Sequence, residues 1–238
     1  MNNSLINSIG QNGIPIGHKS MNLAKKKYWH PLVADFLLGT RHKTAVFNPF
    51  LGKKMFLQAF YVLALIVRNN GHILLVNTNP DYSNFIKNLS SSNPNISYCC
   101  YKWVGGTLTN WKQVSKSVLT FAKFSQRCEN FLQKNNLNFP RYKKVQTFFQ
   151  GLITNQDNLL AFSQKPDLIV IVNPNENQNV IQEANKLHIP IIGFIESNTK
   201  INGITYPIPL NVYSLSTLYY CLKKLFKISI LMNYEVIN

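Results

Sequence analysis

Three short, continuous apolar runs constrain the fold of this chain more than any other feature of its sequence. They are Ile73 to Val76, Leu168 to Val172 and Ile191 to Ile195. Runs of this length and composition are typical of strands buried on both faces, as in a parallel sheet that helices cover on each side. The sequence therefore predicts an α/β fold.

Helical patterns separate and follow these runs. Apolar residues at Val180, Ile181, Ala184 and Leu187 predict one face of a helix between the second and third runs. Such a strand–helix–strand unit has parallel strands joined by a right-handed crossover. Two further helices are predicted, namely Lys53 to Arg68, ended by Asn69, Asn70 and Gly71, and a C-terminal helix marked by Val212, Leu215, Leu218, Leu222 and Leu225.

A segment of different character interrupts this pattern. Between about residues 108 and 163, apolar residues recur twice at helical spacing, on either side of the polar stretch Asn135 to Arg141. Two antiparallel helices joined at that stretch are the simplest account. The expected organisation is a basic N-terminal arm (1–27), an α/β domain (28–110 and 164–230), an inserted helical hairpin (111–163) and a C-terminal tail (231–238).

The charge balance points to a polyanionic partner. The chain carries 25 Lys and Arg against 9 Asp and Glu, which gives a formal net charge of +16. An excess of this size favours nucleic acid as the partner, with an anionic membrane surface as the weaker alternative. A basic surface that serves only solubility is a third interpretation.

Other features bear on location. The longest apolar stretch, Leu57 to Val67, is too short to span a bilayer, so no membrane segment is expected. The first residues lack the pattern of a secretory signal or of an organellar presequence, which suggests a protein made where it works or one already processed. Heavy use of Asn, Lys, Ile, Phe and Tyr is typical of an AT-rich genome and suggests an organellar one.

The sequence offers little support for an enzyme. The stretches after Val76 and Val172, NTNPDYSN and NPNENQN, contain neither a dinucleotide-binding glycine pattern nor a P-loop. The acidic residues are scattered, the histidines form no metal-binding pattern and the cysteines lack C-x-x-C spacing. We therefore expect no catalytic site, cofactor or metal. The alternative is an α/β enzyme that acts on a phosphorylated or nucleotide substrate.

The most informative block is KWVGGTLTNWK, residues 102–112. Gly105 and Gly106 permit unusual backbone angles, and Thr109 or Asn110 can cap the helix that follows. Because glycines before a helix N-terminus favour phosphate binding, this turn is expected to be the central feature that faces a nucleic acid. An ordinary Gly-Gly turn leading into an amphipathic helix is the alternative.

Charged and aromatic residues surround this turn. Trp103 and Trp111 can pack or stack, and Lys112 and Lys116 share one stripe of the predicted helix. A second basic cluster, residues 28–44, contains Arg41, His42 and Lys43 after Gly39, where a turn is predicted. For the second cluster a solvated loop is the alternative. The candidate RNA-binding residues are Lys25, Lys26, Lys27, Arg41, His42, Lys43, Lys53, Lys54, Lys102, Trp103, Gly105, Gly106, Thr109, Asn110, Trp111, Lys112 and Lys116.

Five blocks, in order along the chain, match a known pattern. They are Gly13 to His18, Tyr28 to Pro31 with Gly39 to Lys43, Trp103 to Trp111, Pro166 to Asn198, and Tyr206 to Asn211. Through these blocks the chain resembles the family of small-subunit ribosomal protein two. The resemblance implies a Rossmann-like (flavodoxin-like) parallel sheet with helices on both faces and an inserted antiparallel helical hairpin.

The resemblance also implies a function. A member of this family is a structural constituent of the ribosomal small subunit that binds its RNA near the junction of head and body, beside neighbouring ribosomal proteins. We expect neither a homo-oligomer nor a membrane partner. Glu196 replaces the family's usual aspartate and Leu210 a glycine, and together with the AT-rich bias this divergence favours a mitochondrial copy, with a plastid copy as second choice.

Overall fold

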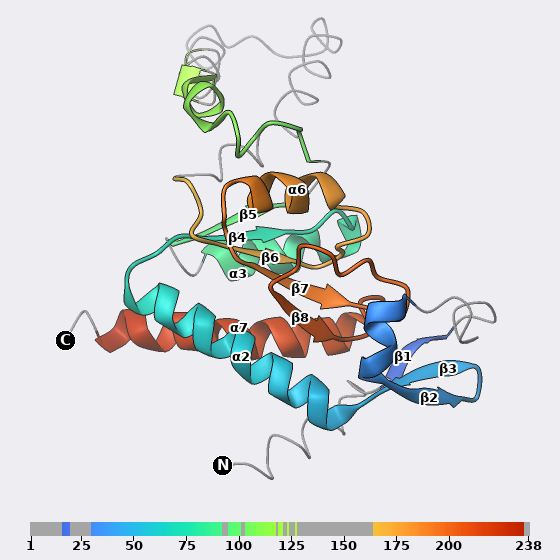
Figure 1. Cartoon of the computed structure of the whole chain (residues 1–238). Coiled ribbons are helices and arrows are strands. Elements are labelled where there is room, and N and C mark those ends of the chain that lie inside the picture. Colours follow the sequence, from blue (N-terminus) through green and yellow to red (C-terminus); the bar gives the residue numbers. More distant parts are fainter. Residues whose placement is uncertain are drawn as a thin grey trace, which may run out of the picture.

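The computed structural model describes residues 16–19, 30–91, 95–100, 103–117, 119–120, 123, 127 and 164–235. These residues form two sheets, with helices on both faces of the larger one (Figure 1). The described residues at the start of the expected inserted hairpin are helical from 111 to 117. Most of that hairpin lies outside the described residues, as does the expected arm apart from residues 16–19, so both remain expectations.

The larger sheet has five strands, all parallel to their neighbours. Their spatial order is β5 (Ile96–Cys99), β4 (Ile73–Val76), β6 (Leu168–Ile171), β7 (Ile191–Ile195) and β8 (Tyr206–Pro209). Every residue of β4, β6 and β7 is buried, as their continuous apolar runs require. The predicted α/β fold and its three central strands are therefore confirmed.

Helices cover the sheet on both faces, and each face has its own core cluster. On one face lie α2 (Pro49–Arg68), α3 (Ser83–Ser91) and α7 (Leu215–Glu235). On the other face lie α6 (Gln178–Lys186) and the segment 103–108. Alternate strand residues serve the two clusters, because successive side chains of a strand point to opposite faces. The adjacent residues Cys99 and Cys100 accordingly belong to different clusters.

A small antiparallel sheet of order β1-β3-β2 precedes the larger one. It is made of β1 (Ile16–Lys19), β2 (Leu37–Arg41) and β3 (Thr44–Phe47), and a 3-10 helix, η2 (Pro31–Phe36), leads into β2. Ala45 and Phe47 are buried in a third cluster with Val33 and Ile195. This cluster fixes the small sheet at the carboxyl end of β7.

Helix α2 is longer than predicted. It begins at Pro49 rather than Lys53, because the Asn48 side chain accepts hydrogen bonds from Phe50 N and Leu51 N and proline suits the first helical position. Among the described helices, it alone is long and apolar enough to cross a membrane by length and composition. Its buried residues Ala59, Leu63 and Val67 pack in the core.

Helix α7 also extends beyond its predicted end. It runs to Glu235, past the boundary expected at residue 230.

Hydrogen bonds hold the loop before α7 at the carboxyl ends of the strands. Glu196 follows β7, and its Oε1 accepts a 2.9 Å hydrogen bond from Val212 N. The hydroxyl of Tyr82, in the 3-10 helix η3 (Pro80–Tyr82), donates to the Val212 carbonyl at 2.7 Å. Val212 is thus held on both sides.

The buried Glu196 carboxyl predicts a pH-dependent stability. Burial raises its pKa to about 7, although hydrogen bonds from the Val212 and Tyr213 backbone act in the opposite direction. The folded chain therefore keeps a proton that the unfolded chain has already released, so the free energy of unfolding falls as the pH rises from about 4.5 to about 7. The full effect is roughly 3 kcal/mol.

Glu196→Gln keeps an acceptor for Val212 N but cannot ionise. We expect the variant to lose this part of the pH dependence, measured by urea unfolding between about pH 5 and about pH 8. Above about pH 7.5 the difference in free energy of unfolding between the chain and the variant should become constant. If the free energies of unfolding of the chain and of the variant change with pH in parallel over the whole range, the raised pKa of Glu196 is contradicted.

Candidate nucleic-acid interface

The first group of predicted residues lies at the tip of the β2–β3 hairpin. Arg41 pairs with Thr44 across the hairpin, which leaves His42 and Lys43 as a two-residue turn with φ of 48° and 63°. Such left-handed angles give the turn the twist that a tight hairpin needs. The Thr44 hydroxyl donates to the Arg41 carbonyl. The turn predicted here is confirmed, and it presents the exposed side chains of residues 41–43 to solvent.

The second group lies in the turn 103–110, which is built around the carboxylate of Glu183 on α6. Its Oε1 accepts hydrogen bonds from Trp103 Nε1 at 3.0 Å and from Gly106 N at 2.8 Å. Its Oε2 accepts from Leu108 N at 2.9 Å and from Thr109 N at 3.4 Å. Glu183 is only 8% exposed, so these four donors replace the water that its carboxylate loses on burial.

This arrangement corrects the expected role of the glycine turn. We expected its backbone N–H groups to bind a phosphate, but those of Gly106, Leu108 and Thr109 already donate to an anion of the protein itself. The anion bound by these N–H groups is a carboxylate of the protein, and the expected contact between the turn and RNA stays a prediction. The turn can face RNA through its exposed surface, but these three N–H groups are engaged.

The two tryptophans of the block differ in exposure. Trp103 is 8% exposed and packs in the cluster beneath α6, which favours packing over stacking on a base. Trp111 is only partly buried against the same cluster. The Asn110 carbonyl accepts from Gln113 N and Val114 N, which places Asn110 at the start of the following helix.

Lysines of that helix extend away from the turn. Lys112 and Lys116 are exposed, and they lie one helical turn apart. Lys54 on α2 is exposed and Lys53 is half-buried. In Figure 1 the β2–β3 hairpin and the segment 103–117 lie at opposite ends of the molecule, so the structure places the predicted residues in two separate groups. Lys25, Lys26, Lys27 and Lys102 lie outside the described residues.

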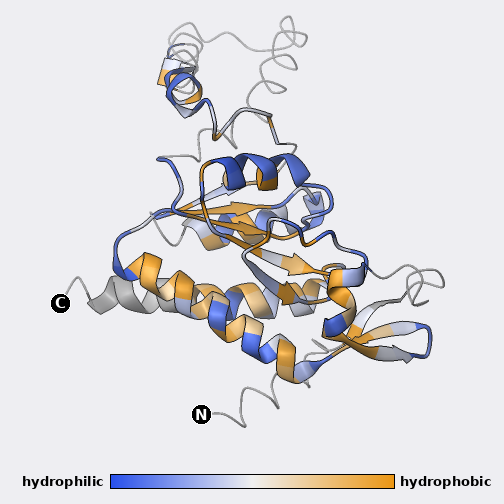
Figure 2. Cartoon of the chain, in the orientation of Figure 1, coloured by the Kyte–Doolittle hydropathy of each residue, from blue (hydrophilic) through white to orange (hydrophobic). Residues whose placement is uncertain are grey.

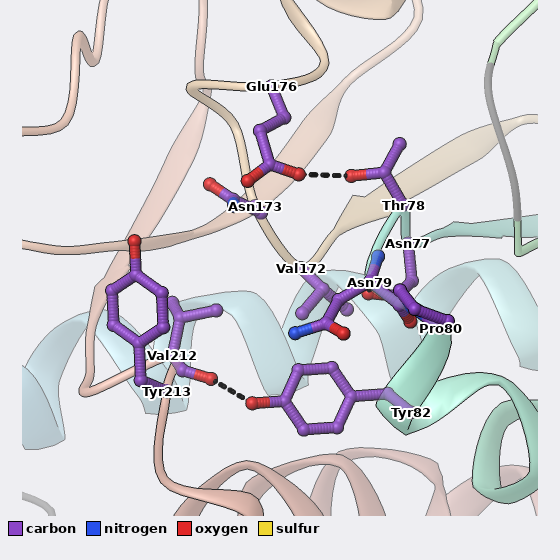
Figure 3. A pocket seen from close by; sticks show the side chains of 10 residues that line it. All are labelled: Asn77, Thr78, Asn79, Pro80, Tyr82, Val172, Asn173, Glu176, Val212 and Tyr213. Carbon is purple, nitrogen blue, oxygen red and sulfur yellow. Dashed lines mark hydrogen bonds between the residues drawn. The ribbon is translucent and has the colours of Figure 1, made fainter.

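A polar crevice lies where a doubly wound sheet usually binds its ligand, between the carboxyl ends of β4 and β6. It has a volume of about 170 Å³ (Figure 3). Glu176 is the one charged residue among those that line it, and its Oε2 accepts a 2.6 Å hydrogen bond from the Thr78 hydroxyl. A phosphate placed in this crevice would meet a carboxylate rather than a cation, which disfavours the alternative of a phosphate-using enzyme.

Sequence reasoning missed Glu183, which was counted among the scattered acids. A signal was available, because Glu183 lies on the same helical face as Val180, Ala184 and Leu187. A carboxylate on the buried face of a helix requires several hydrogen-bond donors from another part of the chain. Those donors lie at least 74 residues away in the sequence, so the sequence alone does not identify them. In the described part of the chain, no group of three or more His, Cys, Asp or Glu residues is placed to hold a metal ion.

Comparisons with known proteins identify relatives. The sequence model of the family described as Ribosomal protein S2 matches residues 12–230. The chain is 39% identical over 164 residues to "Small ribosomal subunit protein uS2m" of Marchantia polymorpha, covering 66% of this chain and 65% of that protein. It is 29% identical over 216 residues to "Small ribosomal subunit protein uS2" of Rickettsia bellii, covering 88% of this chain and 70% of the relative.

The Glu183 contacts predict a large effect of removing the carboxylate. In Glu183→Ala, Trp103 Nε1 and the turn's N–H groups lose their acceptor in a buried place, which should lower the free energy of unfolding by about 3–5 kcal/mol. Glu183→Gln retains one acceptor oxygen and should be intermediate. The control Glu176→Gln, at an exposed carboxylate, should change it by about 0.5 kcal/mol or less. Urea unfolding measures the free energy of unfolding of all three variants. Equal effects of Glu183→Ala and Glu176→Gln would show that the hydrogen bonds to Glu183 contribute little to stability.

The two glycines of the turn should respond differently to substitution. An added Cβ meets nothing within 4 Å at either one, but Gly106 has a φ of +88°. Gly106→Ala should therefore cost about 1–2 kcal/mol of folding free energy through backbone strain, whereas Gly105→Ala should be neutral or slightly stabilising. Thermal melting of the two variants tests this. Similar melting temperatures would show that the backbone at Gly106 relaxes.

Proposed function

Because the chain belongs to the ribosomal protein S2 family, we propose that it is a structural constituent of the small subunit of a mitochondrial ribosome. In that role it binds the small-subunit RNA near the junction of head and body and supports assembly and translation. The family match over residues 12–230 is the observation that carries the proposal. Its members are structural proteins, so no catalytic step is assigned to this chain.

The relatives support both the particle and the compartment. The similarity to the mitochondrial protein of Marchantia polymorpha indicates the mitochondrion as the location. The similarity to the Rickettsia bellii protein, which extends over 88% of this chain, agrees with a small-subunit role. The partners are therefore small-subunit ribosomal RNA and neighbouring ribosomal proteins. We also propose that each particle contains one copy of the chain and that the chain binds no membrane.

Two rigidly supported groups of side chains make the RNA contacts in this proposal. The first is the hairpin tip, where Arg41 and Lys43 are held at a tight turn. The second is the exposed stripe of Lys112 and Lys116, on a helix whose start is fixed through the turn to Glu183. Each cation neutralises a phosphate, and Thr109, Asn110 and the partly exposed Trp111 add contacts near the helix start.

The remaining candidate residues complete the two groups. Lys53 and Lys54, in the second turn of α2, extend the hairpin group. Lys25, Lys26, Lys27 and Lys102 are proposed as further phosphate contacts. The surface of Gly105 and Gly106 lets RNA approach the backbone closely, without taking the N–H groups that Glu183 holds.

Salt dependence tests the RNA contacts. Replacing Lys43 or Lys112 by Ala should weaken binding to transcribed small-subunit RNA and reduce the slope of log K against log salt by about one unit each. The slope is measured between about 50 and about 200 mM salt. Lys223→Ala, on the exposed side of α7, is the control and should leave the slope unchanged. Slopes unaffected in both test variants would assign these lysines to a solvated surface.

A further inference from the structure

Helix α2 is largely apolar on both its inner and its outer face. Its inner face packs against β8 and α7, where Ala59, Leu63 and Val67 are buried. A helix on the surface of a domain normally places polar residues on its other side. Figure 2 shows hydrophobic residues along most of α2, with few hydrophilic interruptions.

The outer face carries a stripe of exposed apolar side chains. Phe50 is 74% exposed, Leu57 39%, Tyr61 64% and Leu65 40%. With the exposed Lys54 and Arg68 they recur every three or four residues, which places all six on one side of the helix, opposite the buried residues. The stripe is about 27 Å long, since each residue advances a helix by about 1.5 Å. We call these six residues the α2 stripe.

The charges of α2 restrict what can cover the α2 stripe. The helix carries Lys53, Lys54 and Arg68 and contains no Asp or Glu. A second copy of this chain would bring cations against cations at both ends of the stripe, because antiparallel pairing places Lys54 beside Arg68. RNA would satisfy the cations but would leave the four apolar side chains between them without an apolar partner. A complementary surface is apolar in its middle and acidic at its ends.

We propose that the α2 stripe docks an amphipathic helix of a neighbouring protein, with apolar side chains at helical spacing and Asp or Glu near both ends. A helix laid along α2 places a ridge of side chains between those of the stripe, and burial of the apolar residues drives the contact. The acidic ends pair with Lys54 and Arg68 and fix the direction of docking. The inference depends on the proposed function in one respect, because the proposed function identifies the particle that contains this partner.

A photocrosslinking residue in place of Tyr61 tests the proposal in the full chain within isolated small subunits. The expected product is a crosslink to a protein segment whose sequence has apolar residues at helical spacing and an excess of Asp and Glu, identified by mass spectrometry. Crosslinks to RNA, to lipid, to a second copy of the chain, or to a segment without this pattern overturn the inference. So does the absence of any crosslink.

The same probe at Lys112 separates the inference from the proposed function. A crosslink from residue 112 to small-subunit RNA supports the proposed function whatever residue 61 contacts. If the chain is found in another particle and residue 61 still crosslinks an acidic amphipathic helix, the docking inference stands and the proposed function fails.

Paired substitutions give an independent readout. Leu57→Ser with Leu65→Ser should reduce incorporation in competition with the unaltered chain by about tenfold or more, because apolar contacts at an interface centre dominate binding. Leu215→Ser is the control, because Leu215 is 56% exposed on α7, away from the α2 stripe. It should change incorporation by about twofold or less, as surface substitutions usually do.

Both variants should melt within a few degrees of the unaltered chain, since none of the replaced side chains belongs to a core cluster. Normal incorporation of the double variant overturns the proposal. If the double variant melts early, the residue 61 crosslink remains as the deciding measurement.

Discussion

Four N–H groups from the segment 103–109 converge on the carboxylate of Glu183, and this contact determines how one side of the molecule is built. A buried carboxylate is tolerated only where donors surround it, so the indole, the glycine turn and α6 must come together as a unit. The unit covers one face of the sheet and also fixes the start of the helix that carries Lys112 and Lys116. An internal anion thus organises a surface whose proposed partner is itself an anion.

The sheet adds a second constraint. Strand order β5-β4-β6-β7-β8 separates two connections: α3, which follows β4, lies on one face of the sheet, and α6, which follows β6, lies on the other. The crevice at the carboxyl ends of β4 and β6 follows from that topology. In many α/β proteins this position binds a phosphorylated ligand at glycine-rich turns. Here the turns carry Pro80 and Pro174, which lack N–H groups, and Glu176 contributes a negative charge. The same architecture is consistent with a structural protein whose binding surfaces lie elsewhere.

Sequence patterns predicted the parts of the fold in which one physical cause dominates. Continuous apolar runs identified β4, β6 and β7, because full burial leaves little choice of side chain. The strand β8 was missed, since Pro207 and Pro209 argue against a strand in isolation. The β2–β3 hairpin was interpreted as a turn alone, because Arg41 to Lys43 show basic character but no strand pattern. The glycine turn was located correctly, whereas its partner depended on a tertiary contact with Glu183.

The prolines of β8 also affect the border of the larger sheet. Among the strands that the structure describes, β8 has one neighbour, β7, and its outer side would ordinarily offer unpaired backbone groups to any extended peptide nearby. Of its residues Tyr206 to Pro209, only Tyr206 and Ile208 possess a backbone N–H. A chain that adds to a sheet needs regularly spaced donors and acceptors, so β8 is a poor template for further strand growth. The border thereby resists the edge-to-edge aggregation to which unassembled ribosomal proteins would otherwise be exposed.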